Sequence, residues 1–448
     1  MSRTLGFISL GCSKNLVDTE MMIGILKKAG YELTDDLSKA QVIIVNTCTF
    51  IDPAKEESIQ TILEAARYKK TGKCEKLVAA GCLTQQYKKS LGKEIPEIDI
   101  FIGTDSWQHI LEAVNQSYAH EGEQVYMTDT APCEHEELIP RQTLTPDYSA
   151  YVKIAEGCSN GCTFCYIPYV RGPMRSRTMD SVIHEVRRLT AEGIKEFNLI
   201  AQDLSCYGRD LEDGTTLAKL LKELVKIQGV KWIRLFYLYP TYFDDELLHV
   251  IISEEKICKY VDIPLQHISD SVLRRMHRKD SAKSIKLLLN KLKEATPKIY
   301  IRTTLMVGFP GETEEDFKEL CDFVKEIKFD NLGAFMYSPQ EGTPAARMDG
   351  QADEAVKEDR YHELMSIQAE ISEENNKKLI GTDTEVLVEE IMIGAEGRVQ
   401  AKARASFQAP EVDGNVYIDD PGDVKPGDFI NVHITDGYAY DLIAERIE

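Results

Sequence analysis

Short apolar runs alternate with longer amphipathic segments over the first hundred residues. The runs have the length and uninterrupted apolar character of strands buried in a parallel sheet, and they cover residues 4–10, 40–46, 76–80 and 97–103. Apolar positions between them recur with helical spacing, and one helix is predicted to begin at Asp52 and Pro53 and to end before Gly72. Residues 1–130 are therefore expected to form a doubly wound α/β domain.

The alternation stops at residues 131–147, which contain three prolines and are predicted to be a linker, and it resumes at residue 148. Six strand-like runs follow, at residues 151–157, 196–202, 232–238, 260–266, 298–309 and 332–338. Helical patterns separate them, and Thr313 and Asp316 have the spacing of a capping box. Six β–α units within residues 148–375 predict a partial, TIM-like (β/α)6 barrel.

A different pattern begins near residue 381. Five short strand-like runs are separated by turn signals, and they cover residues 384–390, 397–403, 414–420, 428–435 and 440–447. This pattern predicts a small antiparallel, OB-like β-barrel over residues 381–448. The segment contains 15 acidic and 5 basic residues, so it carries nearly half of the chain's net charge of −21.

Composition narrows the classes of protein that the chain can belong to. With 448 residues, 43% of them hydrophobic, it is long enough for several cores. We find no secretion signal and no apolar run of about 18 residues, so we expect no membrane span and a cytoplasmic location. The net charge of −21 disfavours broad binding to nucleic acid and favours a basic partner. Eleven cysteines in such a chain fit metal ligands and buried thiols better than a disulfide framework.

Three cysteines of the first domain each follow a predicted strand: Cys12, Cys48 and Cys82. Sites in parallel α/β sheets form at the carboxyl ends of the strands, so these three thiols are expected to converge there. The alternative for each is a small buried apolar residue, because free cysteine is often buried. Three cysteines at equivalent positions favour a shared metal centre.

A second group of three cysteines follows the first predicted barrel strand, in the run EGCSNGCTFCYIP. Barrel enzymes place catalytic groups at this end of their strands. Cys158, Cys162 and Cys165 could bind three irons of a [4Fe-4S] cluster and leave the fourth iron free. Zinc with a remote fourth ligand is the structural alternative.

The C-x3-C-x2-C turn after a first barrel strand resembles the signature of the radical S-adenosylmethionine enzymes. The resemblance implies that S-adenosylmethionine chelates the free iron and that Cys158, Cys162 and Cys165 are catalytic. It also implies an electron donor such as flavodoxin or ferredoxin. Phe164, Gln202 and Arg302 are further candidates for cofactor contacts, with a core aromatic as the alternative for Phe164. The arginine-rich run 171–177 could bind a carboxylate of the substrate or cosubstrate, or form a solvated loop.

The resemblance extends to the methylthiotransferases, over nearly the whole chain. It implies that Cys12, Cys48 and Cys82 hold a second, auxiliary [4Fe-4S] cluster and that the C-terminal barrel is a TRAM domain that binds the substrate. The runs SLGCSKNLVDTE, AQD with CYG, PLQHISD and YSPQEGTP resemble the RimO type, although Leu204 and Cys206 depart from its usual pattern.

The RimO type implies transfer of a methylthio group to the β-carbon of an aspartate in small-subunit ribosomal protein twelve, free or within the ribosome. Two alternatives stay open: a tRNA adenosine methylthiotransferase of the MiaB type, and a non-enzymatic zinc-binding ribosome-assembly factor. A barrel that reads tRNA would be expected to display Lys and Arg, whereas this one carries a net charge of −10. Its charge suits a basic ribosomal protein and disfavours tRNA.

Overall fold

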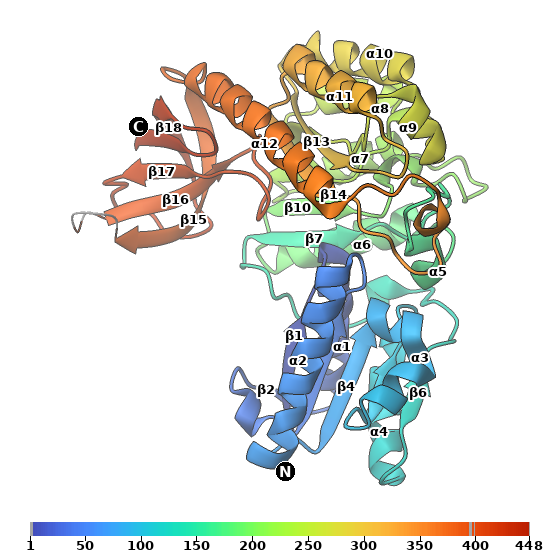
Figure 1. The fold of residues 1–448 in the computed structure, drawn as a ribbon. Coiled ribbons are helices and arrows are strands. Elements are labelled where there is room, and N and C mark those ends of the chain that lie inside the picture. The colour runs from blue at the N-terminus through green and yellow to red at the C-terminus, as the bar shows by residue number, and fades with distance from the viewer. Residues whose placement is uncertain (1–2, 394–396, 398, 448) are drawn as a thin grey trace.

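The computed structural model describes residues 3–393, 397 and 399–447. Figure 1 shows three bodies: an N-terminal α/β part, a central α/β part, and a C-terminal β-barrel joined to the central part through the long helix α12. The predicted fold class is confirmed, because two parallel sheets and a closed barrel follow each other in the expected order.

The N-terminal sheet has six parallel strands in the order β2-β1-β3-β4-β5-β6. Its strands are β1 (Thr4–Ser9), β2 (Glu32–Leu33), β3 (Val42–Thr47), β4 (Lys76–Gly81), β5 (Ile100–Ile102) and β6 (Val125–Met127). Every residue of β3 and β4 is buried, which explains their continuous apolar character. The sequence analysis missed β2 and β6, which are only two and three residues long and lie at the sheet edges.

Four α-helices pack on the two faces of this sheet: α1 (Ser13–Lys28), α2 (Asp52–Thr71), α3 (Cys82–Glu94) and α4 (Ile110–Ala119). Helix α2 begins and ends where the sequence predicts, with Pro53 in its first turn and Gly72 as its C-cap. Helix α1 is buried along most of its length because it lies between this sheet and the central part, where it contacts β7.

The central sheet has six parallel strands in the sequential order β14-β13-β12-β11-β10-β7, with ends that do not meet. The strands are β7 (Ser149–Lys153), β10 (Glu196–Ile200), β11 (Trp232–Leu235), β12 (Ile257–Asp262), β13 (Tyr300–Val307) and β14 (Asn331–Met336). All six runs expected from the sequence are strands, so the partial barrel is confirmed. A two-stranded hairpin of β8 (Ala155–Glu156) and β9 (Arg175–Ser176) is an addition that the sequence analysis missed.

Helices cover one face of the central sheet and bury its largest apolar core. They are α6 (Met179–Ala191), α7 (Leu217–Leu224), α8 (Asp245–Ser253), α9 (Asp270–Arg275), α10 (Ala282–Lys293), α11 (Glu314–Ile327) and α12 (Glu354–Lys377). The short helix α5 (Ile167–Arg171) instead contacts α3 of the N-terminal part. The predicted capping box of Thr313 and Asp316 is present at the start of α11. Aromatic side chains of the opposite face, such as Tyr151 and Tyr260, share a core with residues of α1 and of the C-terminal barrel.

The C-terminal barrel closes in the order β15-β16-β17-β19-β18. Its strands are β15 (Asp383–Ile393), β16 (Val399–Ala405), β17 (Val416–Asp419), β18 (Phe429–Gly437) and β19 (Leu442–Arg446). The barrel is antiparallel as predicted, except that β17 and β19 pair in parallel to close it. Stacking of Tyr300 on Phe407 and an edge contact of Trp232 with Phe429 attach the barrel to the central sheet.

The predicted linker, residues 131–147, packs tightly against both neighbouring parts. It contains a 3-10 helix (Glu136–Leu138), and the side chain of its Arg141 is 1% exposed. Arg141 donates hydrogen bonds to Glu20 of α1 and to Glu185 of α6. This arginine therefore ties the N-terminal part to the central part. Among the described residues, no helix is long and apolar enough to cross a membrane.

Candidate functional site: two groups of three cysteines

The first group of three cysteines lies at the carboxyl ends of three adjacent strands. Cys12 is the N-cap of α1 after β1, Cys48 directly follows β3, and Cys82 begins α3 directly after β4. The order β1-β3-β4 places these strand ends side by side. The turn is close-packed as well, because a Cβ at Gly11 would lie 2.8 Å from the Cβ of Cys48. The structure thus brings together three cysteines that lie 34 to 36 residues apart along the chain.

Burial governs the protonation of these thiols. It raises the pKa of Cys48, and it raises the pKa of Cys82 to about 12 although the Arg171 guanidinium acts in the opposite direction. Cys12 is exposed, and its charge contributes to the pKa of both other thiols. A metal centre stabilises the thiolate form that such buried thiols otherwise avoid.

The second group occupies one loop between β8 and α5. Gly157 and Gly161 adopt φ values of 78° and 69°, which let the loop turn sharply around Cys158, Cys162 and Cys165. Burial raises the pKa of all three thiols, that of Cys165 to about 12, and charges on Cys158 and Cys162 add to the shift at Cys165. The loop sits at the carboxyl end of β7, at the mouth of the partial barrel.

The donor chemistry of both groups fits an iron–sulfur cluster. All eleven cysteines are free thiols, so each group offers three sulfur ligands, the preferred donors of such clusters. Within the described part of the chain, no three Cys, His, Asp or Glu side chains gather closely enough to hold one metal ion. In a cluster each cysteine binds a separate iron.

Arg171, the last residue of α5, connects the two groups. Its guanidinium donates to Asn15 of α1 at 2.5 Å and to Glu156 of β8 at 2.8 Å. It also contacts Asp18 of α1 at 3.2 Å, and its side chain is 1% exposed. Burial would raise the pKa of Glu156, but Arg171 and Lys153 outweigh that effect and hold it well below its usual range.

The arginine-rich run after the second group binds carboxylates of the chain itself. Arg171 pairs with Glu156, Arg175 pairs with Asp105 at 2.7 Å, and Arg177 pairs with Glu185. The expectation of a solvated loop is wrong for Arg171 and Arg177, whose side chains are 1% and 9% exposed. The run is a set of buried and half-buried ion pairs that hold the cysteine loop on its neighbours.

The three further cofactor candidates lie at the central sheet. Gln202 follows β10 and donates to Glu156 at 2.5 Å, and its Oε1 is buried without a partner. Arg302 of β13 contacts Asp262 at 3.1 Å and Asp413 of the C-terminal barrel at 3.4 Å. Phe164 packs edge-on against Phe309, with the two ring centroids 6.3 Å apart. Their roles toward a cofactor stay predictions.

A further residue of the site was missed by sequence reasoning. Lys14, two positions after Cys12, is 6% exposed and places its Nζ 3.3 Å from the ring centre of Tyr237. Burial, partly opposed by the Cys12 charge, lowers the pKa of Lys14 to about 8. Tyr237 follows β11 with a φ of 60°, a left-handed conformation that is rare for a residue with a side chain. No sequence pattern reveals this contact, because it joins two parts of the chain.

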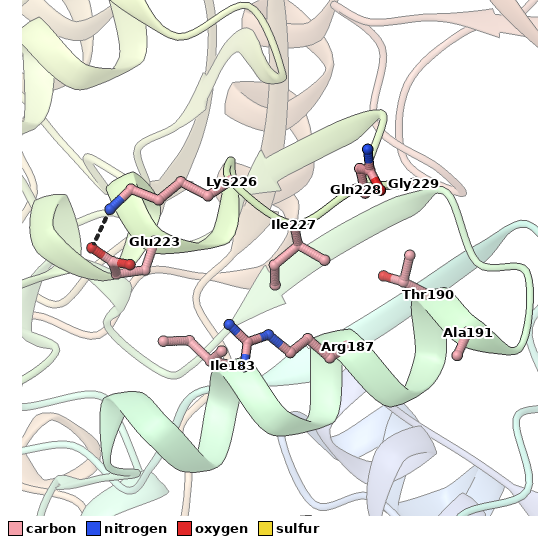
Figure 2. A pocket seen from close by; sticks show the side chains of 9 residues that line it. All are labelled: Ile183, Arg187, Thr190, Ala191, Glu223, Lys226, Ile227, Gln228 and Gly229. Carbon is pink, nitrogen blue, oxygen red and sulfur yellow. Dashed lines mark hydrogen bonds and ion pairs between the residues drawn. The ribbon is translucent and has the colours of Figure 1, made fainter.

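A hollow on the outer helical layer lies away from both groups. Figure 2 shows it between α6 and the turn that leads into β11. Its volume is about 710 Å³. That turn precedes its strand, so the hollow belongs to the amino ends of the strands. The cysteines lie at the carboxyl ends.

Family models match three consecutive regions of the chain. Residues 4–103 match the uncharacterized protein family UPF0004, residues 152–324 match the radical SAM superfamily, and residues 380–447 match the TRAM domain. The first two matches each contain one group of three cysteines.

Curated relatives match over the full length of the chain. A ribosomal protein uS12 methylthiotransferase RimO from Geotalea uraniireducens is 48% identical, with 99% of this chain and 98% of the relative covered. Proteins of the same name from Pelobacter propionicus and Geobacter sulfurreducens are also 48% identical and cover 98–99% of this chain.

Solved structures share the fold at low sequence identity. The radical S-adenosylmethionine methyltransferase TsrM from Kitasatospora setae, with cobalamin and a [4Fe-4S] cluster bound, matches with a TM-score of 0.58 at 15% identity, covering 77% of each chain. The cobalamin-dependent S-adenosylmethionine radical enzyme OxsB matches with a TM-score of 0.54 at 13% identity, over 83% of this chain and 56% of its own.

Proposed function

Because this chain belongs to the RimO family of ribosomal protein uS12 methylthiotransferases, which are radical S-adenosylmethionine enzymes, we propose that it modifies protein uS12. The reaction would replace one hydrogen on the β-carbon of one aspartate of that protein with a methylthio group, the hydrogen being removed by the radical that S-adenosylmethionine supplies. The observation that supports this proposal most directly is the pair of three-cysteine groups, one at the strand ends of each parallel sheet, with Arg171 between them.

The two groups would hold two [4Fe-4S] clusters with different tasks. Cys158, Cys162 and Cys165 would bind the cluster that holds S-adenosylmethionine, and Cys12, Cys48 and Cys82 would bind the auxiliary cluster. When bound, the first cluster would supply the electron for cleavage of S-adenosylmethionine to methionine and a 5′-deoxyadenosyl radical, and the auxiliary cluster would supply the site of the transferred sulfur.

The chain's own residues would position the reactants and exclude water. Phe164 and Gln202 would contact the cofactor, since Phe164 belongs to the cysteine loop and Gln202 donates to Glu156, which precedes that loop. Arg302 would contact the cofactor with only part of its guanidinium group, because its Nη1 already contacts Asp262 and its Nε contacts Asp413. The aromatic face of the central sheet, closed by α1 and the C-terminal barrel, would shield a radical from solvent.

Charge supports a basic protein as substrate. The C-terminal barrel carries a net charge of −10, and an acidic surface attracts a basic ribosomal protein while it repels the phosphates of tRNA.

We place the reaction in the cytoplasm, with flavodoxin or ferredoxin as the electron donor.

An anaerobic competition assay tests this proposal. The reconstituted enzyme receives S-adenosylmethionine, a reductant, purified uS12 and bulk tRNA, and mass spectrometry follows both substrates. We expect one methylthio group on uS12 and none on tRNA. Modification of tRNA alone would establish the MiaB-type alternative. A colourless protein that contains zinc and no acid-labile sulfide would establish the assembly factor.

A further inference from the structure

Lys14 is a buried cation without an ionic partner. The other buried lysines and arginines of the described chain each have a hydrogen-bond acceptor or carboxylate within reach, as Lys153 has Asp18 and Arg404 has Glu196. For Lys14, the contacts within the described residues include neither a hydrogen bond nor an ion pair. Its ammonium group lies 3.3 Å from the ring centroid of Tyr237, while Cys12, Glu156 and Asp262 act on it electrostatically without forming an ion pair.

This arrangement is costly in the free protein. Removing an ammonium ion from water is costly unless an anion compensates it, and a cation–π contact returns only part of that cost. Tyr237 adds to the cost, because its φ of 60° places it in the left-handed region. A binding partner that brings a negative charge would offset this cost.

The location of Lys14 limits which anion can reach it. The residue lies in the first turn of α1, and the ring beneath it stands at the carboxyl end of β11, in the mouth of the partial barrel. Two other cations nearby are already paired: Arg171 with Glu156 and Asp18, and Arg302 with Asp262 and Asp413. Among the described residues, Lys14 is therefore the buried cation without an ion pair where the N-terminal part meets the barrel mouth.

The charge of the whole chain creates a need for such a group. A net charge of −21 attracts a basic protein but repels the one acidic side chain that has to enter the site. We propose that the Lys14 ammonium, supported by the ring of Tyr237, binds the carboxylate of the target aspartate and so presents its β-carbon for reaction. This inference rests on the proposed function and identifies a specificity residue for it.

A double-mutant cycle with the holoenzyme tests this inference. Lys14→Met removes the charge and nearly keeps the shape, Lys14→Arg keeps the charge, and Lys28→Met removes an exposed lysine from the other end of α1 as the control. Each variant is titrated with uS12 and with uS12 that carries asparagine in place of the target aspartate.

We expect Lys14→Met to weaken binding of uS12 by about 10- to 100-fold, the range of a charge-assisted hydrogen bond. Binding of the asparagine-containing protein should change less than about 3-fold on the same substitution, and Lys14→Arg should restore much of the loss. Lys28→Met should leave both affinities unchanged. Equal weakening of both substrates, or none, would overturn the assignment.

Two measurements separate the other possible anions. If Lys14→Met instead weakens binding of S-adenosylmethionine, the lysine binds the carboxylate of the cosubstrate. If the substitution shifts the reduction potential of the auxiliary cluster without changing the affinity for uS12, the lysine interacts with that cluster. Either result overturns the assignment. If Lys14→Met does not fold, Lys14→Gln takes its place in the titrations. The affinity of the unsubstituted enzyme for the two forms of uS12 then gives the reference against which Lys14→Gln is compared. Failure of the proposed function would give a different result from failure of this assignment, because the enzyme without any substitution would then leave uS12 unmodified.

Discussion

The two groups of three cysteines bring three thiols together in opposite ways. Cys158, Cys162 and Cys165 lie in one loop, and two glycines with positive φ allow its turns. Cys12, Cys48 and Cys82 come from three strand ends and meet only when the sheet has formed in the order β1-β3-β4. The loop is therefore a local structure, whereas the strand-end group depends on the tertiary fold and on its contact with the central part.

The largest effect is expected when the loop group is removed. Joint replacement of Cys158, Cys162 and Cys165 by alanine should abolish 5′-deoxyadenosine formation and leave about half of roughly eight irons, since the strand-end group is intact. Iron analysis and an anaerobic assay of S-adenosylmethionine cleavage measure both. Continued cleavage by this variant would show that the roles are assigned wrongly.

Joint replacement of Cys12, Cys48 and Cys82 by alanine should give the complementary result. The variant should also hold about half the iron. It should still cleave S-adenosylmethionine but form no methylthio product, because the proposed sulfur-donating site is gone. Mass spectrometry of uS12 beside quantification of 5′-deoxyadenosine distinguishes the two variants, and product formation here would refute the division of tasks.

Arg171→Met should loosen the connection between the groups. The substitution removes one of the two buried cations that Glu156 and Asp18 share and leaves Lys153, so we expect a cost of about 1.5–3 kcal/mol in the free energy of unfolding. Lys39→Met, which removes an exposed ion pair with Asp36, should cost less than about 1 kcal/mol. Denaturant titration of both apo-proteins measures the difference, and equal effects would contradict the bridging role.

Acid should weaken the connection between the N-terminal and central parts. Burial would raise the pKa of Glu185, but Arg177 and Arg141 lower it from 4.5 to about 2. Its stabilising contribution, about 3 kcal/mol, is complete above pH 4.5 and is lost as the pH falls toward 2. Unfolding free energies measured across this range should fall by less in Glu185→Gln, because that side chain does not titrate. An identical pH dependence would exclude the carboxylate as the source.

The smallest expected effects distinguish the packing of the two groups. Gly161→Ala should cost about 1 kcal/mol for its positive φ alone, since the nearest atom to a new Cβ, on His277, lies 3.6 Å away. Gly11→Ala should cost about 2–3 kcal/mol, because its Cβ would also press on Cys48 at 2.8 Å. Thermal unfolding of the apo-proteins compares them, and a larger loss for Gly161→Ala would reverse the contrast.

Sequence patterns revealed what depends on local order. All six strands of the central sheet and all five of the barrel follow from apolar runs bounded by turns, and the cysteine loop follows from its spacing. The edge strands β2 and β6 were not predicted, because two or three residues are too few to show an alternation or an apolar run typical of a strand. The sequence analysis treated Arg141 as a linker residue and Lys14 as one position of the SLGCSKNLVDTE motif. The residues that contact them are distant in the chain, so only the packed structure shows that Arg141 is paired with carboxylates and that Lys14 is not.

The contacts of the C-terminal barrel restrict how the protein can be recombined with its relatives. Arg404 binds both carboxylate oxygens of Glu196 at 2.8 and 2.7 Å, Tyr260 donates to Asp413 at 2.7 Å, and Arg234 donates to the carbonyl of Ser406. A chimera joined after α12 would exchange one half of each pair and keep the other. Functional exchange of this barrel therefore requires that Glu196, Arg234 and Tyr260 be matched to the incoming partner residues.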